Sequence, residues 1–112
     1  MSTSGIDAVF LETHNWGKSV RFFQALGYKL EFETDHNSGM LRNGDGPYLF
    51  ISEVPENRAT GTQIVFKADE GFEPAPELEV VSPFEDTHYG TTEMTVRDPD
   101  GRTWIVQKPG KG

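Results

Sequence analysis

One helix-like segment between strand-like segments most strongly constrains how this chain folds. Apolar residues from Trp16 to Leu26 follow the three- and four-residue spacing of an amphipathic helix. Asn15 is suited to cap the start of this helix, and Gly27 stands where a glycine commonly ends one. Alternating residues and turn formers around it predict strands at Ile6–Glu12, Tyr28–Thr34, Gly39–Arg42 and Tyr48–Glu53. The first half is therefore predicted to be β-α-β-β-β.

The second half repeats these strands but excludes the helix. Thr62–Ala68 has the pattern of a strand, and Gly71, Pro74 and Pro76 then rule out a helix of ordinary length. The remaining strands are predicted at Leu78–Val81, Thr91–Arg97 and Thr103–Lys108. The simplest description is a single α+β domain, residues 1–112, built from two repeated modules at about 5–54 and 61–108.

The net charge of −8 is concentrated in one part of the 112 residues. Residues 68–96 hold eight acids and no Lys or Arg, and residues 69–86 are expected to be an exposed connection. An acidic chain with a pI near 4.7 and no basic cluster is a poor match for nucleic acid. The sequence also has no apolar run of about 18 residues, no signal-peptide pattern and no cysteine. These observations predict a cytoplasmic protein that binds neither nucleic acid nor membrane.

Two parts of the chain resemble a known family. The opening part is Ile6–Leu11 followed by Lys18–Tyr28, and the closing part is Gly90–Arg97 followed by the turn Asp98-Pro99-Asp100-Gly101. In this order they look like the vicinal oxygen chelate superfamily, which includes glyoxalases, extradiol dioxygenases and bleomycin-resistance proteins. The resemblance covers nearly the whole chain. It implies two βαβββ modules forming a cup-shaped mixed sheet, here with the second helix missing or much shortened, and usually a second copy as partner.

The resemblance also implies three metal-ligand positions. Carried over position by position, they fall on Ala8, Gln63 and Ile105. Alanine and isoleucine have no donor atom, and one amide oxygen is fewer than the three or four protein ligands that a metal site needs. The sequence therefore predicts no metal and no cofactor at this position.

Other chemistry-bearing residues do not form a recognisable catalytic set. His14, His36 and His88 fall in predicted turns, without a second ligand spaced to share one ion, and are expected to face solvent. The serines lack the Gly-x-Ser-x-Gly context of a nucleophile. No catalytic residue is therefore predicted.

The predicted cup has a mostly apolar and aromatic lining, as small-molecule pockets do. Strand alternation counted from Ala8 assigns one side of each strand to the cup. The residues predicted to contact a ligand are Phe10, Glu12, Tyr48, Phe50, Gln63, Val65, Glu93 and Ile105. The alternative is that Phe10, Tyr48 and Phe50 fill the cup as core. The residues assigned to the core between helix and sheet are Trp16, Phe23 and Trp104.

The missing second helix has a consequence for assembly. Without it, Ile64, Phe66, Trp104 and Val106 are expected to be poorly shielded, and exposed apolar patches usually mark an interface. A homodimer is therefore predicted, with the Pro-rich linker or the partner covering the gap.

These observations lead to one leading functional hypothesis and two alternatives. The leading hypothesis is a metal-free small-molecule binding protein of the bleomycin-resistance type, which sequesters an aromatic or cationic compound such as an antibiotic. The first alternative is a glyoxalase- or dioxygenase-like metalloenzyme, or a lyase or isomerase, with a divergent active site carried by Glu12, Gln63 and Glu93. The second is an accessory domain with a filled cup. Whether the chain is an enzyme is left open.

Overall fold

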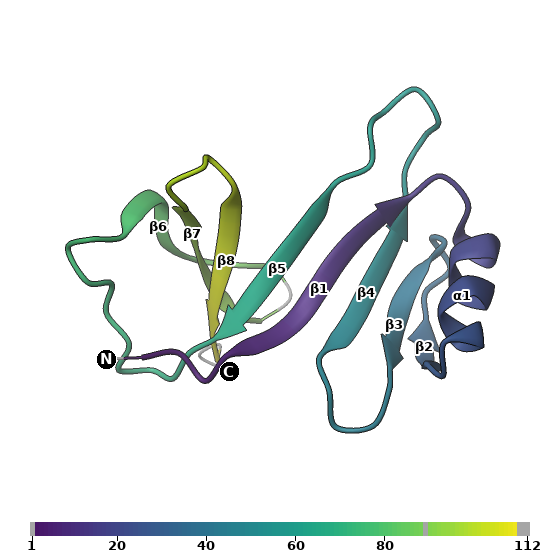
Figure 1. The fold of residues 1–112 in the computed structure, drawn as a ribbon, viewed down its shortest axis with the longest axis horizontal. Helices are drawn as coiled ribbons and strands as arrows, with labels where there is room; N and C mark the ends of the chain where they lie inside the picture. Colours follow the sequence, from purple (N-terminus) through teal and green to yellow (C-terminus); the bar gives the residue numbers. More distant parts are fainter. Residues whose placement is uncertain (1, 89, 110–112) are drawn as a thin grey trace. The chain divides into compact units, whose positions relative to one another are not determined.

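One helix and eight strands make up the described part of the chain. The computed structural model describes residues 2–88 and 90–109, and these residues form an α+β protein (Figure 1). They divide into a first unit, Ala8–Gln63, and a second unit that joins the N-terminal segment up to Asp7 with the chain from Ile64 onward. The predicted α+β class is confirmed. Within the described residues, no helix is long and apolar enough to cross a bilayer.

The first unit follows the predicted order of elements. They are β1 (Ile6–Thr13), α1 (Trp16–Ala25), β2 (Lys29–Glu33), β3 (Ser38–Arg42) and β4 (Tyr48–Glu53). The strands lie in the order β2-β3-β4-β1, in which β1 and β4 are parallel and the other neighbours antiparallel. The predicted β-α-β-β-β arrangement is confirmed.

Helix α1 begins and ends at the residues expected from the sequence. The side chain of Asn15 accepts a hydrogen bond from the backbone N–H of Lys18 at 3.0 Å. The carboxylate of Glu53 accepts the N–H of Trp16 at 2.8 Å, which satisfies a second donor at this end. Gly27 has φ +101°, the left-handed conformation that ends a helix with little cost only at glycine.

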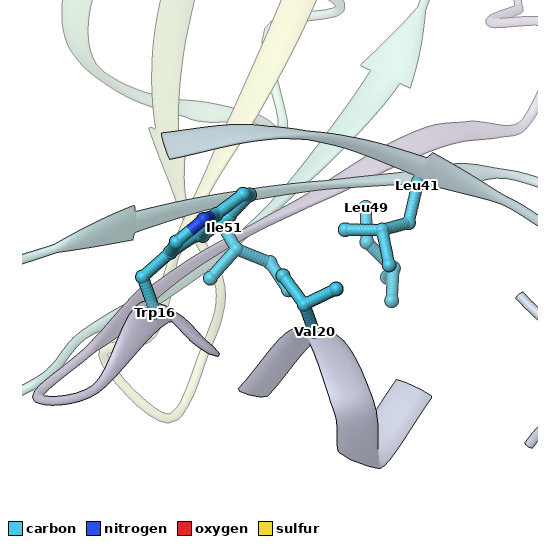
Figure 2. Packing of buried hydrophobic residues seen from close by; sticks show 5 residues of the cluster. All are labelled: Trp16, Val20, Leu41, Leu49 and Ile51. Atoms are coloured by element: carbon cyan, nitrogen blue, oxygen red, sulfur yellow. The ribbon is translucent and has the colours of Figure 1, made fainter. Parts of the chain in front are cut away.

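The core of the first unit lies between α1 and one face of its strands. Figure 2 shows Trp16 and Val20 of the helix directed toward Leu41, Leu49 and Ile51 of the strands. Leu41 and Ile51 are completely buried. The assignment of Trp16 to the core is confirmed, and the partly buried Phe23 packs against the same cluster.

The second unit contains four strands. They are β5 (Thr62–Lys67), β6 (Glu79–Asp86), β7 (Thr92–Arg97) and β8 (Thr103–Lys108). The strands lie in the order β5-β8-β7-β6, in which β5 and β8 are parallel and the other neighbours antiparallel. Residues 68–78 are described throughout and contain no helix, as predicted from the glycine and prolines.

The length of β6 and the extent of the acidic connection before it both differ from what was expected. It was expected to end at Val81 but continues to Asp86, so the acidic stretch is an exposed connection only as far as Leu78. Among the described strands of its unit, β6 pairs with β7 alone, and its register shifts on both sides of Ser82. An edge strand with such irregularities accommodates Pro83, which has no backbone N–H to donate to a neighbouring strand.

The linker between β5 and β6 contributes a side chain to the core of the second unit. Phe72 of this linker is 4% exposed and packs in a cluster with Ala68, Met94, Val96 and Val106. The rings of Phe66 and Trp104 stack on each other with their centres 5.4 Å apart. Both side chains pack against the same cluster. Val106 is buried, and Ile64, Phe66 and Trp104 are half-buried, so the expected poorly shielded patch is absent at these four described residues.

The turn between β7 and β8 is fixed by one carboxylate. Asp98 accepts hydrogen bonds from the Trp104 indole at 2.9 Å, the Arg102 guanidinium at 2.9 Å and two backbone N–H groups. The Trp104 bond first, and then the Arg102 bond, hold the pKa of Asp98 well below its usual value. The ionised carboxylate therefore stabilises the hairpin.

Candidate functional site

The helix-free face of the first unit carries half of the residues predicted to contact a ligand. The parallel register pairs Ala8 with Tyr48, Phe10 with Phe50, and Glu12 with Ser52. Val9, Leu11, Leu49 and Ile51, which alternate with these residues, belong to the helix-covered core. The paired residues therefore lie on the opposite face, which α1 leaves uncovered.

Three phenylalanines form an aromatic row across this face. The rings of Phe10 and Phe50 are 5.8 Å apart and inclined at 58°, and those of Phe50 and Phe32 are 6.3 Å apart and inclined at 54°. Met40 is register partner of both Phe50 and Phe32. Phe10 and Phe50 are half-buried, and Phe32 is 47% exposed. The aromatic row (Phe10, Phe50 and Phe32) is thus an apolar surface accessible from the helix-free side.

Sequence reasoning missed Phe32 because of an irregularity in β2. Leu30 pairs with Leu41 of the core, but Phe32 pairs with Met40, so β2 advances two residues where β3 advances one. This shift turns Phe32 to the side opposite Leu30, whereas regular alternation would place both on one side. No residue type in the segment Lys29–Glu33 signals the shift.

Glu12, which was predicted to contact a ligand, accepts hydrogen bonds from the connection between β4 and β5. One carboxylate oxygen accepts a hydrogen bond from the guanidinium of Arg58 at 2.9 Å, and the other accepts the N–H of Gly61 at 2.9 Å. His14 adds a contact of 2.7 Å from its Nε2 to the carbonyl of Arg58. Both oxygens of Glu12 hold the connection after β4, so this carboxylate is a poor candidate for a general base.

A cationic side chain lies beside the Tyr48 end of this face. The guanidinium of Arg42 is 5.4 Å from the centre of the Tyr48 ring, and its Nε is 3.3 Å from the carboxylate of Glu31. Arg42 and Lys29 also line a shallow, open depression of about 570 Å³ where β2 begins and β3 ends. Glu31 lines the same depression and offsets part of its positive charge.

Of the other predicted ligand residues, Val65, Glu93 and Ile105 lie in the second unit, and Gln63 is the last residue of the first unit. Val65 pairs with Ile105, and both are buried, at 0% and 7% exposure. Glu93 pairs with Gln107, whose amide donates to its carboxylate at 2.9 Å. By strand alternation Glu93 and Gln107 share a face with Ile105, and Gln63 and Val65 share a face of β5. That this face and the aromatic row line one pocket stays a prediction.

The residues at the three metal positions that the resemblance implies do not fit a metal. Ala8 is completely buried and Ile105 is 7% exposed, and neither has a donor atom, which leaves Gln63 as one weak ligand. Within residues 2–88 and 90–109, no three His, Cys, Asp or Glu side chains gather as a metal site would require. His14, His36 and His88 are all exposed, as expected, and His36 contacts the neighbouring Asp35 at 3.2 Å.

Comparison with known proteins identifies the fold. No family model matches the chain, and no curated protein matches it. A glyoxalase/bleomycin resistance protein/dioxygenase superfamily member from Vibrio splendidus 12B01 has a similar structure, with a TM-score of 0.61 and 19% identity over 90% of this chain and 96% of that one. Methylmalonyl-CoA epimerase from Mycobacterium tuberculosis gives a TM-score of 0.71 with 11% identity, over 96% of this chain and 89% of that one.

A halotolerant catechol dioxygenase adds a third similar structure. Its TM-score is 0.65 with 9% identity, over 96% of this chain and 40% of the dioxygenase chain. The chain therefore has the fold of the glyoxalase/bleomycin resistance/dioxygenase superfamily, as the resemblance in the sequence implied. Enzymes are among the proteins that share this fold, so the fold alone does not assign an activity.

Proposed function

We propose that the chain is a small-molecule binding protein of the bleomycin-resistance type, which sequesters an aromatic or cationic compound such as an antibiotic. The observation that carries the proposal is the aromatic row of Phe10, Phe50 and Phe32 on the helix-free face. A ring contact in an offset or edge-on geometry is worth about 0.5–1.5 kcal/mol beyond the area that it buries. A flat ligand that touches two of these rings therefore gains both apolar burial and ring contacts.

Two features support a cationic aromatic ligand. The faces of aromatic rings attract cations, and the contribution grows as the site excludes water. The net charge of −8 also raises the concentration of cations near the protein, an effect that salt weakens. The ligand of this proposal is a flat aromatic compound with a positive charge. A cytoplasmic location is part of the proposal, since a cysteine-free chain suits a reducing compartment.

The proposal does not use the metal chemistry of the superfamily. Ala8 and Ile105 occupy two of the three ligand positions that the resemblance implies, and neither side chain can coordinate an ion. Binding a small molecule without turnover requires no metal-coordinating side chain at these positions.

Ligand titrations with wild type and two variants of Phe50 test the proposal. Cationic aromatic antibiotics and size-matched neutral aromatics are screened by thermal shift, and hits are titrated by calorimetry at low and high salt. We expect Phe50→Ala to weaken binding by about tenfold, because the ligand loses the ring contact and the apolar burial that the central ring of the row provides. Phe50→Leu keeps the apolar bulk and should retain part of the affinity. Binding that is equally strong in wild type and Phe50→Ala, or a panel without any hit, contradicts the proposal.

A divergent enzyme is the second candidate, and the position of Glu93 is the observation that favours it. Gln107 donates to the Glu93 carboxylate at 2.9 Å and so fixes one of its oxygens. A fixed carboxylate on a strand face is suited to accept a proton from a bound substrate. Metal analysis of protein purified without chelator separates the candidates, because stoichiometric Fe, Mn, Ni or Zn would support an enzyme and contradict the proposal. Loss of ligand turnover in Glu93→Gln, with binding retained, would support a metal-free lyase or isomerase and contradict the proposal.

A further inference from the structure

The open depression where β2 begins and β3 ends is lined by three side chains that donate hydrogen bonds, and binding of an aromatic cation does not use them. These side chains are Lys29, Arg42 and Asn43. Among the described residues that line the depression, Glu31 alone is acidic, so two positive charges face one negative charge. In a chain whose net charge is −8, this local excess of positive charge favours an anionic group.

The guanidinium of Arg42 is oriented by two contacts. Its Nε is 3.3 Å from the carboxylate of Glu31, and its Cζ is 5.4 Å from the centre of the Tyr48 ring. The Nε contact is an ion pair without the geometry of a hydrogen bond, and Nε is shielded from solvent. These contacts use Nε and the face of the group and leave the edge formed by Nη1 and Nη2 for another acceptor. Such an edge fits the two oxygens of a carboxylate.

Lys29 and Asn43 add two further donors to the same depression. Lys29 is the register partner of Arg42, so the two cationic side chains are neighbours on β2 and β3. The amide of Asn43 lies beside Gly27, where a Cβ would be 3.3 Å from its Nδ2. The depression therefore collects a guanidinium, an ammonium and an amide around one opening.

Arg42 lies at one end of the face that carries the aromatic row. It follows Met40 by two residues on β3, and Tyr48 precedes Phe50 by two residues on β4, so each pair shares a side of its strand. Two residues of a strand span roughly 7 Å. A compound whose ring lies on Phe50 can therefore reach Arg42 with an acidic group held at about this distance.

We propose that Arg42, Lys29 and Asn43 bind a carboxylate of the ligand, which makes the ligand an aromatic zwitterion and not a simple cation. The rest of the ligand lies on the aromatic row, so this inference rests on the proposed function. A singly charged carboxylate is favoured over a doubly charged phosphate, because Glu31 already offsets one of the two positive charges.

Norfloxacin and its methyl ester are a matched pair of probes. Both are flat, fluorescent and positively charged, but only the free acid carries a carboxylate. Each is titrated by fluorescence anisotropy in buffer without divalent metals, which the free acid would chelate. We expect the free acid to bind about fivefold more tightly than the ester, a modest factor because both cationic side chains are accessible to solvent.

Three variants show which side chains cause this difference. Arg42→Gln should lower the affinity for the free acid to that for the ester and leave the affinity for the ester nearly unchanged. Glu31→Gln removes a like charge but keeps an acceptor for Arg42, and should raise the affinity for the free acid about two- to threefold. Arg21→Gln is the matched control, because it removes the same charge from an exposed residue of α1 and should change neither affinity. Folding of each variant is checked by circular dichroism and urea unfolding.

The outcomes distinguish this inference from the proposed function. Equal binding of the acid and the ester, or equal losses in Arg42→Gln and Arg21→Gln, would overturn the carboxylate site. The proposed function would still stand in that case if Phe50→Ala weakened the binding of both probes. Stronger displacement of the free acid by inorganic phosphate than by acetate at equal ionic strength would also overturn the carboxylate site. Absence of binding by both probes, or binding that Phe50→Ala does not weaken, contradicts both proposals.

Discussion

The indole of Trp16 lies directly against the backbone of Gly39, so that a Cβ placed on Gly39 would be 2.9 Å from Cη2 of the indole and 2.9 Å from Cα of Glu33. Both residues are buried, and Trp16 is part of the helix-to-sheet core. The close packing of α1 on β3 therefore depends on the absence of a side chain at this position.

Gly39→Ala is expected to destabilise the protein by about 1–3 kcal/mol, because the added Cβ would overlap the backbone of the neighbouring strand and the buried indole. Urea unfolding measures the change. Gly17→Ala is the matched control: a Cβ there meets only ordinary contacts, the nearest being Arg21 Nη1 at 3.4 Å. Since alanine is the better helix former, this control should stabilise by about 0.5–1 kcal/mol. Equal effects of the two substitutions would contradict the prediction.

Phe72→Ala is expected to lower the free energy of unfolding by about 3–5 kcal/mol, since the ring is 4% exposed and is part of the core of the second unit. Urea unfolding followed by the signal of the half-buried Trp104, which packs on that cluster, reports the loss. Glu73→Ala alters the exposed neighbour in the same linker and should change stability by less than about 0.5 kcal/mol. A small effect of Phe72→Ala would show that the linker is not part of the core.

Asp98 is expected to make the stability depend on pH in the acid range. Its pKa is lowered in the folded state, so its contribution is fully present above the unfolded pKa of about 4 and is lost as the pH falls below it. Asp98→Asn should therefore be less stable at neutral pH, and the difference from wild type should shrink between about pH 4 and pH 2. Asp100→Asn removes a carboxylate that receives a longer contact from Arg102, at 3.3 Å, and serves as control. A constant difference across the pH range would refute this role of Asp98.

Glu12→Ala is expected to loosen the connection between β4 and β5. The loss of the hydrogen bonds to Arg58 and Gly61 should lower the free energy of local opening of this connection by about 1 kcal/mol. The effect is this small because the ion pair is partly exposed. Trypsin cleavage after Arg58 should then become about fivefold faster. Mass spectrometry of the digest gives the rate, and Glu56→Ala in the same connection is the control. Unchanged cleavage would mean that Glu12 does not hold this segment.

Much of the first unit could be predicted from sequence because its signals are local. The cap at Asn15, the left-handed Gly27 and the helical spacing between them each act within a few residues. The alternation that assigned Phe10 and Phe50 to one face is also local, and the parallel register of β1 and β4 places them side by side. These features needed no knowledge of distant contacts.

The features that were missed depend on contacts between strands. The register shift in β2 brings Phe32 into the aromatic row, and it is defined only by pairing with β3. Strand β6 passes through Pro83 because it lies at an edge, which a residue-by-residue reading does not reveal. The burial of Phe72 was likewise hidden, because a linker residue gives no periodic signal and its partners Met94 and Val106 follow much later in the chain.

The linker that carries Phe72 also bears on the order of folding. In the second unit, β6, β7 and β8 form successive hairpins, whereas Val65 of β5 pairs with Ile105, 40 residues further along the chain. Without a helix between β5 and β6, few local contacts bring β5 close to β8. The entropy of closing the loop therefore opposes the pairing of these two strands until the hairpins have formed. The three-stranded meander should therefore assemble first and serve as the template on which β5 docks, with Phe72 arriving as the loop closes.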